Sequence, residues 1–257
     1  SLGQNFLVDL NVIKKITNLV NIKNKNIIEI GPGKGAITNQ ILMKEPKSII
    51  LIEKDNLLSE RLKKKYNKIK SIKIYNQDIL DFDLEKIIKK DTIIFGNLPY
   101  NISSQILIKI LKLKKWPPKF TSLIFMFQKE VAEKILGKFN TSKYGRLSII
   151  TNYKLMILKK FDISPNCFSP RPKVISTVLH LKPNKKRYVK LNNINNLEKI
   201  TQIFFSNKRK MINKSVKKIF KDINKLKQIK NINLSSRPSE ISPEKFYDLA
   251  KLFEKTQ

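Results

Sequence analysis

The fold is decided by the stretch Ile27-Ile28-Glu29-Ile30-Gly31-Pro32-Gly33-Lys34-Gly35. Its first four residues have the character of a buried strand, and glycine then occupies every second position. Because glycine lacks a Cβ atom, such a loop tolerates positive φ and lets a ligand approach the backbone closely. The spacing differs from the G-x-G-x-x-G of nicotinamide-binding enzymes and from that of a phosphate-binding loop. Taken alone, the motif fits a plain tight turn equally well.

Two further strand-like runs lead to acidic residues. Ile49-Ile50-Leu51-Ile52 precedes Glu53, and Ile72-Lys73-Ile74-Tyr75 is followed shortly by Asp78. A carboxylate about 20 residues beyond a glycine loop is placed to bind the hydroxyls of a ribose. The alternative for Glu53 is a solvated strand end. Together, these runs fit an adenosine-containing ligand at the carboxyl edge of a parallel sheet.

A fourth strand-like run, residues 92–95, ends in Gly96-Asn97-Leu98-Pro99-Tyr100. The order of these motifs resembles S-adenosylmethionine-dependent methyltransferases that act on an exocyclic amine. Such an amine is a poor nucleophile, because its lone pair is delocalised into the ring. The side-chain oxygen of Asn97 and a carbonyl that Pro99 holds rigidly can accept its N–H bonds, and Tyr100 can stack on the base. The alternative is an Asn-Pro turn after a strand.

Strand, loop and helix patterns alternate as far as Phe127, which predicts an α/β fold with a doubly wound parallel sheet. The other expected elements are a helix capped by Asp9, a strand at 123–127, a polar loop at 138–146 on the ligand side, and closing strands at 153–158 and 174–181. Between those strands, Pro165, Pro170 and Pro172 stiffen a non-helical segment that fixes Phe168. We expect Phe168 to offer a second face for the target base; the alternative is that it fills the core.

The charge predicts a polyanionic partner, since 53 basic and 20 acidic residues give a net charge of +33. Part of this excess could reflect an AT-rich genome, because Lys, Ile and Asn are abundant throughout. Composition shifts at residues 183–187, the predicted linker between a catalytic domain at 1–183 and a basic helical domain at 184–257. Residues 207–230 hold ten Lys or Arg and one acid, which favours phosphate contact over a merely solvated helix face.

Several classes of function are disfavoured by composition. Cys167 is the single cysteine, so no internal disulfide can form and a reducing compartment is expected. His180 is the single histidine and is interpreted as a packed strand residue, so no zinc or other metal site is expected. No apolar run reaches the ~18–20 residues that cross a bilayer, so we expect no membrane partner.

The sequence resembles the KsgA family of ribosomal RNA small-subunit adenine dimethyltransferases along nearly its whole length. The N-terminal half shares with it Gly3-Gln4-Asn5-Phe6-Leu7, the glycine loop, Glu53, Asp78, Gly96-Asn97-Leu98-Pro99-Tyr100-Asn101-Ile102 and Gln128-Lys129-Glu130-Val131. The remainder shares Tyr144-Gly145-Arg146-Leu147-Ser148, Phe168-Ser169-Pro170-Arg171-Pro172-Lys173-Val174, Lys208-Arg209-Lys210 and Ile241-Ser242.

The resemblance implies a mostly parallel, seven-stranded methyltransferase sheet, a small C-terminal helical domain and S-adenosyl-L-methionine as cofactor. The implied cofactor-binding residues are Asn5, Leu7, Gly31, Gly33, Gly35, Glu53, Asp78 and Asn97. The implied catalytic residues are Asn97, Leu98, Pro99, Tyr100 and Phe168, and the RNA-binding residues are Arg146, Lys208, Arg209 and Lys210. One departure is Lys54, where the family usually has an apolar residue.

The implied reaction is dimethylation of the 6-amino group of two adjacent adenosines in the 3′-terminal hairpin loop of small-subunit ribosomal RNA, linked to subunit maturation. The expected partner is that RNA or the immature small subunit, bound by a monomer in the bacterial cytosol or in an organelle of bacterial origin. One alternative is the large-subunit adenine methyltransferase type that confers macrolide resistance. Another is a non-catalytic RNA-binding assembly factor, although the intact motif from Asn97 to Tyr100 argues against it.

Overall fold

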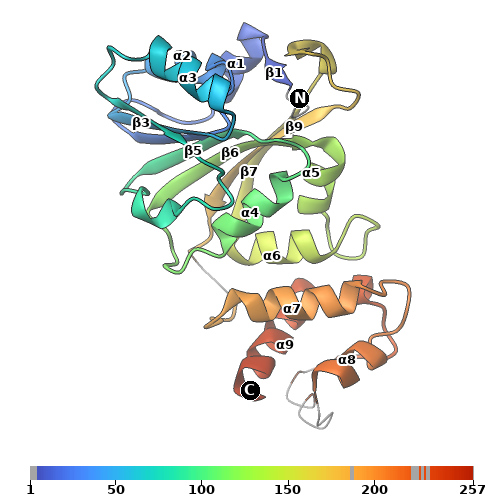
Figure 1. Ribbon diagram of the computed structural model, residues 1–257. Coiled ribbons are helices and arrows are strands. Elements are labelled where there is room, and N and C mark those ends of the chain that lie inside the picture. The colour runs from blue at the N-terminus through green and yellow to red at the C-terminus, as the bar shows by residue number, and fades with distance from the viewer. Residues whose placement is uncertain (1–4, 186–187, 221–225, 227–228, 230–231, 257) are drawn as a thin grey trace. The chain divides into compact units, whose positions relative to one another are not determined.

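A computed structural model of the chain describes residues 5–185, 188–220, 226, 229 and 232–256 (Figure 1). Its contacts divide these residues into two units. The first consists of the described residues up to Ala132 together with Met156–Pro183. The second consists of Glu133–Leu155 together with the described residues from Asn184 onward.

The first unit is built on a seven-stranded sheet with the order β4-β3-β2-β5-β6-β9-β7. The strands are β2 (Asn26–Ile30), β3 (Ser48–Glu53), β4 (Ile72–Asn76), β5 (Thr92–Asn97), β6 (Phe120–Gln128), β7 (Leu155–Ile163) and β9 (Ser176–Pro183). Strands β4, β3, β2, β5 and β6 are parallel, and β9 is antiparallel to β6. The predicted doubly wound, mostly parallel sheet is therefore confirmed.

Helices cover both faces of this sheet. Figure 1 shows α1 (Leu10–Thr17), α2 (Ala36–Leu42) and α3 (Asn56–Lys65) on one face and α4 (Ser103–Leu111) on the other. Because both faces are covered, central strands contain continuous apolar runs, as in Ile93-Ile94-Phe95 of β5, all of them buried. The predicted cap of α1 is confirmed, since an oxygen of Asp9 accepts from the Val12 N–H at 2.9 Å.

A small second sheet fixes the N-terminal segment. Strand β1 (Phe6–Leu7) pairs antiparallel with β8 (Phe168–Ser169), which follows the short helix η2 (Pro165–Cys167). The N–H of Val8 extends this ladder by donating to the carbonyl of Cys167 at 2.9 Å. Leu7 and Phe168 thereby enter the main apolar core of the unit.

The second unit consists of helices. They are the end of α5 (Lys129–Ile135), α6 (Arg146–Lys154), α7 (Ile194–Phe205), α8 (Asn213–Ile219), the short η4 (Pro238–Glu240) and α9 (Pro243–Thr256). Phe204 of α7 stacks edge to face on Phe246 of α9, and both rings are fully buried. The hydroxyl of Tyr144, buried ahead of α6, donates to the carbonyl of Ile241 at 2.9 Å.

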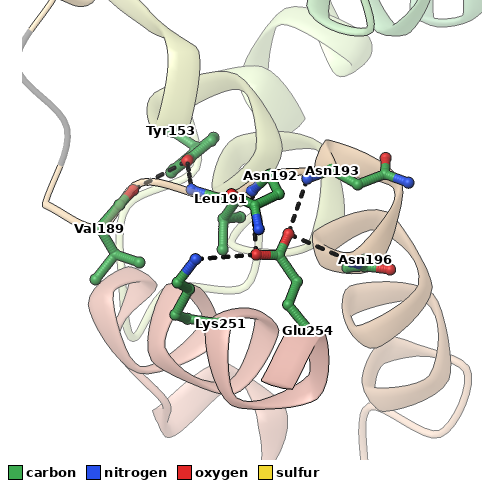
Figure 2. Close-up of polar contacts among 8 residues, drawn as sticks. All are labelled: Tyr153, Val189, Leu191, Asn192, Asn193, Asn196, Lys251 and Glu254. Carbon is green, nitrogen blue, oxygen red and sulfur yellow. Dashed lines mark hydrogen bonds and ion pairs between the residues drawn. The ribbon is translucent and has the colours of Figure 1, made fainter. Parts of the chain in front are cut away.

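A carboxylate ties the chain ahead of α7 to the last turn of α9 (Figure 2). Glu254 accepts from the N–H groups of Asn192 and Asn193 at 3.1 and 2.8 Å, and from the side chains of Asn196 and Lys251. The hydroxyl of Tyr153 donates to the carbonyl of Val189 and accepts from the Leu191 N–H, both at 2.9 Å. These contacts give the segment at 189–193 a defined path although it lies in no helix or strand.

The structure differs from the predicted elements around residue 150. A strand was expected at 153–158, but Tyr153 and Lys154 end helix α6 and strand β7 begins at Leu155. Six of the nine residues of α6 are buried, so the helix shows no single apolar face that sequence periodicity could detect. The second unit also includes residues 133–155, which the sequence analysis placed in the catalytic domain.

His180 packs within β9, as predicted, with its Nε2 atom 3.1 Å from the hydroxyl of Ser122. Gly3, Gln4, Lys186, Arg187, Asp222, Ile223 and Lys230 lie outside the described residues. In the part of the chain that the structure describes, no helix is long and apolar enough to span a bilayer.

Candidate functional site

A pocket opens at the carboxyl ends of β2, β3 and β5 in the first unit. It spans about 700 Å³ when its open mouth is counted. It is lined by Asn5, Phe6, Leu7, Glu29, Gly31, Pro32, Gly33, Lys34, Ala36, Ile37, Glu53, Asn97, Leu98, Pro99 and Tyr100. The sequence motifs of three strands and of the N-terminal segment therefore meet at one place, as expected of the carboxyl edge of a parallel sheet.

The glycine loop forms the floor of this pocket. Its backbone has a conformation that residues other than glycine rarely adopt. Gly31, Gly33 and Gly35 have φ values of 65°, 58° and 79°. A Cβ atom on Gly33 would lie 2.9 Å from the ring of Phe6. The loop thus needs glycine both for its positive φ and to let β1 approach.

Glu53 helps to shape the pocket that it lines. Its two carboxylate oxygens accept from the N–H groups of Gly33 and Asp55, each at 3.0 Å. The side chain is buried, and this burial raises its pKa above the usual range, against the lowering effect of these two bonds. A carboxylate has about four acceptor positions, so Glu53 retains capacity for the hydroxyls of a ribose.

Glu29 is a second buried carboxylate in the pocket wall, and the sequence analysis did not assign it a role. Its Oε2 atom accepts from the hydroxyl of Thr38 at 2.6 Å, and the residue is 1% exposed. Burial raises the pKa of Glu29 to about 7, and the nearby charge of Glu53 acts in the same direction. The signal for Glu29 was its place within the strand that enters the glycine loop.

Asn97 ends strand β5 and presents a hydrogen-bond acceptor at the pocket. Its Nδ2 atom donates to the carbonyl of Asn5 at 3.2 Å, an orientation assigned from this contact. Its Oδ1 atom has no partner among the described residues, and the carbonyl of Leu98 has none either. The carbonyl of Pro99, in contrast, accepts from the Ile102 N–H at 3.2 Å. The two unpaired oxygens can accept the N–H bonds of an amine.

Tyr100 lines the pocket beside these oxygens and is held by its hydroxyl, which lies 2.6 Å from the hydroxyl of Ser176. Phe168 does not line the pocket. It is 4% exposed and belongs to the core that contains Leu7, so in this structure the core-filling alternative describes its position. A second aromatic face opposite Tyr100 would require Phe168 to leave that core.

Asp78 also lies apart from the pocket lining. Its Oδ2 atom accepts from the Lys54 ammonium at 2.7 Å, and its Oδ1 atom accepts from the Leu80 N–H at 2.8 Å. The bond from Lys54 is the main reason that the pKa of Asp78 falls below its usual range. Lys54, the residue that departs from the family pattern, therefore already donates to the carboxylate that was predicted to bind the cofactor.

The predicted RNA-binding residues all lie in the second unit. Lys208, Arg209 and Lys210 are exposed in the turn between α7 and α8, where Lys208 also donates to the carbonyl of Ser142 at 3.2 Å. Arg146 begins α6 and forms an ion pair with Glu198 of α7. Part of the hydrogen-bonding capacity of the Arg146 guanidinium is therefore used by Glu198 within the same unit.

Comparison with known proteins identifies the family. The family model described as ribosomal RNA adenine dimethylase matches residues 1–255. The chain belongs to this family. The ribosomal RNA small subunit methyltransferase A of Pelagibacter ubique is 46% identical, over 99% of this chain and 96% of that protein. The enzyme of the same name from Francisella tularensis subsp. novicida is 43% identical, over 86% of this chain and 84% of that protein.

Solved structures share the fold of this dimethylase. A dimethyladenosine transferase from Plasmodium falciparum superposes with a TM-score of 0.78 at 24% identity, covering 97% of this chain and 98% of that one. The 23S rRNA methyltransferase ErmE superposes with a TM-score of 0.70 at 21% identity, covering 97% and 100% of the two chains. At these identities the likeness concerns the fold alone.

Enzymes of the dimethylase family use S-adenosylmethionine, and the pocket fits this cofactor. Any side chain at Gly33 would collide with Phe6, so backbone alone faces the ligand there. Two buried carboxylates, Glu29 and Glu53, suit a ligand that carries a positive sulfonium and ribose hydroxyls. The acceptors that line the pocket therefore suit the sulfonium and the ribose of the cofactor.

Proposed function

We propose that this dimethylase converts two adjacent adenosines in the 3′-terminal hairpin loop of small-subunit ribosomal RNA to their N6-dimethyl forms, as a step of subunit maturation. The observation that carries the reaction is the pair of oxygens at the pocket, Asn97 Oδ1 and the Leu98 carbonyl, that have no partner among the described residues. The small-subunit substrate is supported by the relative from Pelagibacter, whose match runs over nearly the whole chain.

When bound, S-adenosylmethionine supplies a methyl group activated by its sulfonium. Glu53 would accept from the ribose hydroxyls, while Asn5, Leu7, Gly31 and Gly33 would form the walls and floor of the site. Gly35 is not among the residues that line the pocket, and it shapes the glycine loop by its positive φ at the start of α2. Asp78 already accepts from Lys54 at 2.7 Å and from the Leu80 N–H, and it would bind the adenine ring of the cofactor through its remaining acceptor positions. Asn97 serves both ligands, because it holds Asn5 in place and faces the reacting base.

The two oxygens make the amine more nucleophilic by drawing its hydrogens out of the plane of the ring, which takes the nitrogen lone pair out of conjugation. Pro99 fixes the backbone directly after the Leu98 carbonyl, so this acceptor keeps its position. In the second round the amine carries one methyl group and one N–H, so a single acceptor has to suffice. Two separate oxygens, one from a side chain and one from the backbone, can accept both N–H bonds in the first methylation and the one remaining N–H bond in the second.

Stacking on Tyr100 favours an adenosine that is already unpaired. A base–aromatic stack contributes about 1–3 kcal/mol, whereas extracting a base from a duplex costs a few kcal/mol. Phe6 and Tyr100 are the aromatic residues of the described pocket lining, and the ring of Phe6 packs against Gly33 of the glycine loop. With Phe168 buried in the core, Tyr100 is the ring next to Asn97 and Leu98, and stacking on this one ring barely offsets the cost of extraction. Loop adenosines avoid most of the penalty, and sequence-specific RNA recognition usually targets such loops.

The second unit supplies RNA contacts through Arg146, Lys208, Arg209 and Lys210, and the protein acts as a monomer in the cytosol. Its exposed turn between α7 and α8 carries three consecutive cations, which suits phosphate binding. We assign catalysis to the first unit and RNA recognition to the second, which joins Glu133–Leu155 to the described residues from Asn184 onward.

The decisive experiment compares ribosomal substrates. The protein is incubated with methyl-labelled cofactor and either small or large ribosomal subunits from a strain lacking the modification, and the RNA is digested to nucleosides. We expect dimethyladenosine from the small subunit alone, and none with Asn97→Ala. Labelling of the large subunit would favour the macrolide-resistance type, and cofactor binding without turnover would favour a non-catalytic assembly factor.

The structural preference is tested with two short RNAs that contain the same adenosines, in a hairpin loop or in a continuous duplex. Mass spectrometry after equal incubation measures dimethyladenosine in each. We expect the loop to react and the duplex barely to react. Equal product from both would show that pairing imposes no barrier at this pocket.

A further inference from the structure

A second hollow lies on the first unit between α1 and strand β7, and basic side chains surround it. We call it the lysine groove, and define it by Lys14, Lys15, Asn11 and Asn18 on the side of α1 and by Lys159 and Lys160 of β7. It shares no lining residue with the cofactor pocket. The motifs discussed so far give it no role.

The lysines of the groove lack acidic partners, unlike several others of the same unit. Lys23, Lys25 and Lys129 form ion pairs with Glu45, Asp91 and Asp162. None of the four groove lysines has such a partner among the described residues. The acid nearest in sequence to Lys160 is Asp162, which is already bound to Lys129 and Thr177 at 2.8 and 2.7 Å.

Two contacts give the groove a defined shape. The ammonium of Lys15 lies 4.2 Å from the ring centre of Phe161, which holds it against β7. A fifth cation, Lys44 just after α2, donates to the side-chain oxygen of Asn18 at the rim. Like charges gathered in this way repel one another, and an anion in the groove removes that cost. Lysine ammoniums and asparagine amides are both donors to phosphate oxygens.

The groove is joined to the cofactor pocket through the small β1–β8 sheet. Helix α1 follows directly after β1, whose residues Phe6 and Leu7 line the pocket. Strand β7 leads through η2 into β8, the partner of β1. Both walls of the groove therefore continue into one hydrogen-bonded ladder at the pocket, which fixes the groove relative to the reacting base.

We propose that the lysine groove binds the sugar-phosphate backbone of the substrate RNA next to the nucleotides that enter the pocket. This assignment rests on the proposed function, because it takes the RNA that carries the target adenosines as the ligand. Lysines from two elements, with asparagine amides beside them, supply several hydrogen-bond donors to the phosphate oxygens of a backbone strand. The contacts carry no sequence information and position the RNA.

The test uses two variants that each remove four positive charges. The groove variant combines Lys14→Gln, Lys15→Gln, Lys159→Gln and Lys160→Gln. The matched control combines Lys63→Gln, Lys64→Gln, Lys89→Gln and Lys90→Gln, all exposed and outside the groove. The control is well matched in position. Lys63 and Lys64 lie in the last turn of α3, just as Lys14 and Lys15 lie in the last turn of α1.

Binding is measured over a salt series with a hairpin RNA that has a long flanking stem and with a minimal loop oligonucleotide. Each lost phosphate contact lowers the log–log salt slope by about 0.7–0.9. We expect the groove variant to lose about 2–3 units of slope on the long RNA, the control less than one, and neither to change on the loop. KM for the long RNA should rise about tenfold or more in the groove variant, with kcat unchanged.

Equal losses of slope in the two variants would overturn the proposal and assign the effect to overall charge. A groove variant that binds RNA normally but loses affinity for phosphatidylserine vesicles would overturn it in favour of a membrane surface. If the wild type forms no dimethyladenosine while the groove variant still loses slope, the proposed reaction fails and the RNA groove stands.

Discussion

At the scale of single residues, Asn97 divides its amide between two tasks. Nδ2 donates to the carbonyl of Asn5, and Oδ1 remains for the amine. Asn97→Ala removes both contacts, whereas Asn97→Asp keeps an acceptor and loses only the donor. We expect the alanine variant to lower the single-turnover rate about 10²–10³-fold, as for other preorganised polar groups. The aspartate variant should lose less, and calorimetry should show the cofactor Kd changed less than about tenfold in both. An alanine variant with normal turnover would contradict the assignment.

Glu29 makes a prediction about pH, because its folded pKa is raised to about 7 whereas an unfolded glutamate titrates near 4.5. Between these values the folded state holds more protons, so stability falls as pH rises through this window. The difference corresponds to roughly 3 kcal/mol at 1.36 kcal/mol per pKa unit. Glu29→Gln carries no charge and keeps an acceptor for Thr38, so its free energy of unfolding should not fall in this way as pH rises.

Thermal unfolding of both proteins from pH 5 to pH 8 tests this expectation. The Glu29→Gln variant should unfold at a higher temperature than the wild type at pH 8, and the gap should close toward pH 5. Glu60→Gln, an exposed change on α3, serves as the control and should shift neither curve. A gap that is constant with pH would mean that Glu29 does not titrate in this range.

Individual site residues were predictable from sequence where a motif restricts the backbone or ends a strand. Gly31, Glu53 and Asn97 were identified in this way and line one pocket. Phe168 and Asp78 could not be placed, because their positions depend on long-range contacts. Phe168 is drawn into the core by its pairing with Leu7, and Asp78 is bound by Lys54. Neither contact leaves a local pattern in the sequence.

At the scale of secondary-structure elements, the parallel strands were predicted well because β3, β5 and β6 contain continuous apolar runs and β2 and β4 are rich in isoleucine. Helix α6 was missed because it is buried on several sides, which removes the 3.6-residue periodicity on which helix prediction depends. The pairing of β1 with β8 was also invisible, since it joins two-residue strands from opposite ends of the first unit. That pairing nevertheless brings Asn5 and Phe6 to the pocket.

The contact between α9 and the chain ahead of α7 gives a prediction at this scale. The Glu254 side chain is 5% exposed and accepts from two backbone N–H groups. Burial alone would raise the pKa of Glu254, but its hydrogen bonds from Asn193, Asn192, Lys251 and Asn196 together outweigh burial and lower it. Because hydrogen bonds to a charged group contribute about 1.5–3 kcal/mol, Glu254→Gln should lower the free energy of unfolding by an amount of this order at pH 7.

The sign of the pH dependence follows from the lowered pKa. The carboxylate stabilises the fold above the pKa of an unfolded glutamate, and this contribution is lost as pH falls through the lower folded value. The difference between wild type and Glu254→Gln should therefore shrink in acid, as followed by thermal unfolding. Glu244→Gln, an exposed change in the first turn of α9, should cost less than about 1 kcal/mol. Equal costs for the two variants would contradict the role of these contacts.

At the scale of the whole molecule, the question is whether a net charge of +33 is spread evenly or concentrated in binding sites. An even distribution would follow from an AT-rich genome that favours lysine codons. A concentrated one predicts that cations at particular places govern RNA affinity. The exposed turn with Lys208, Arg209 and Lys210 and the lysine groove are the two places that the structure distinguishes.

The turn between α7 and α8 can be tested against cations of the same unit. Neutralising Lys208, Arg209 and Lys210 to Gln removes three charges, and so does neutralising Lys214, Lys217 and Lys218, which are exposed on α8. If the turn is a phosphate site, the first variant should lose about 2–3 units of log–log salt slope for small-subunit RNA and the second less than one. Lys208 already donates one hydrogen bond to Ser142, so it should account for the smallest part of the lost salt slope among the three residues. Equal slopes for the two variants would show that the charge acts collectively, since a diffuse cationic surface loses the same amount wherever three charges are removed.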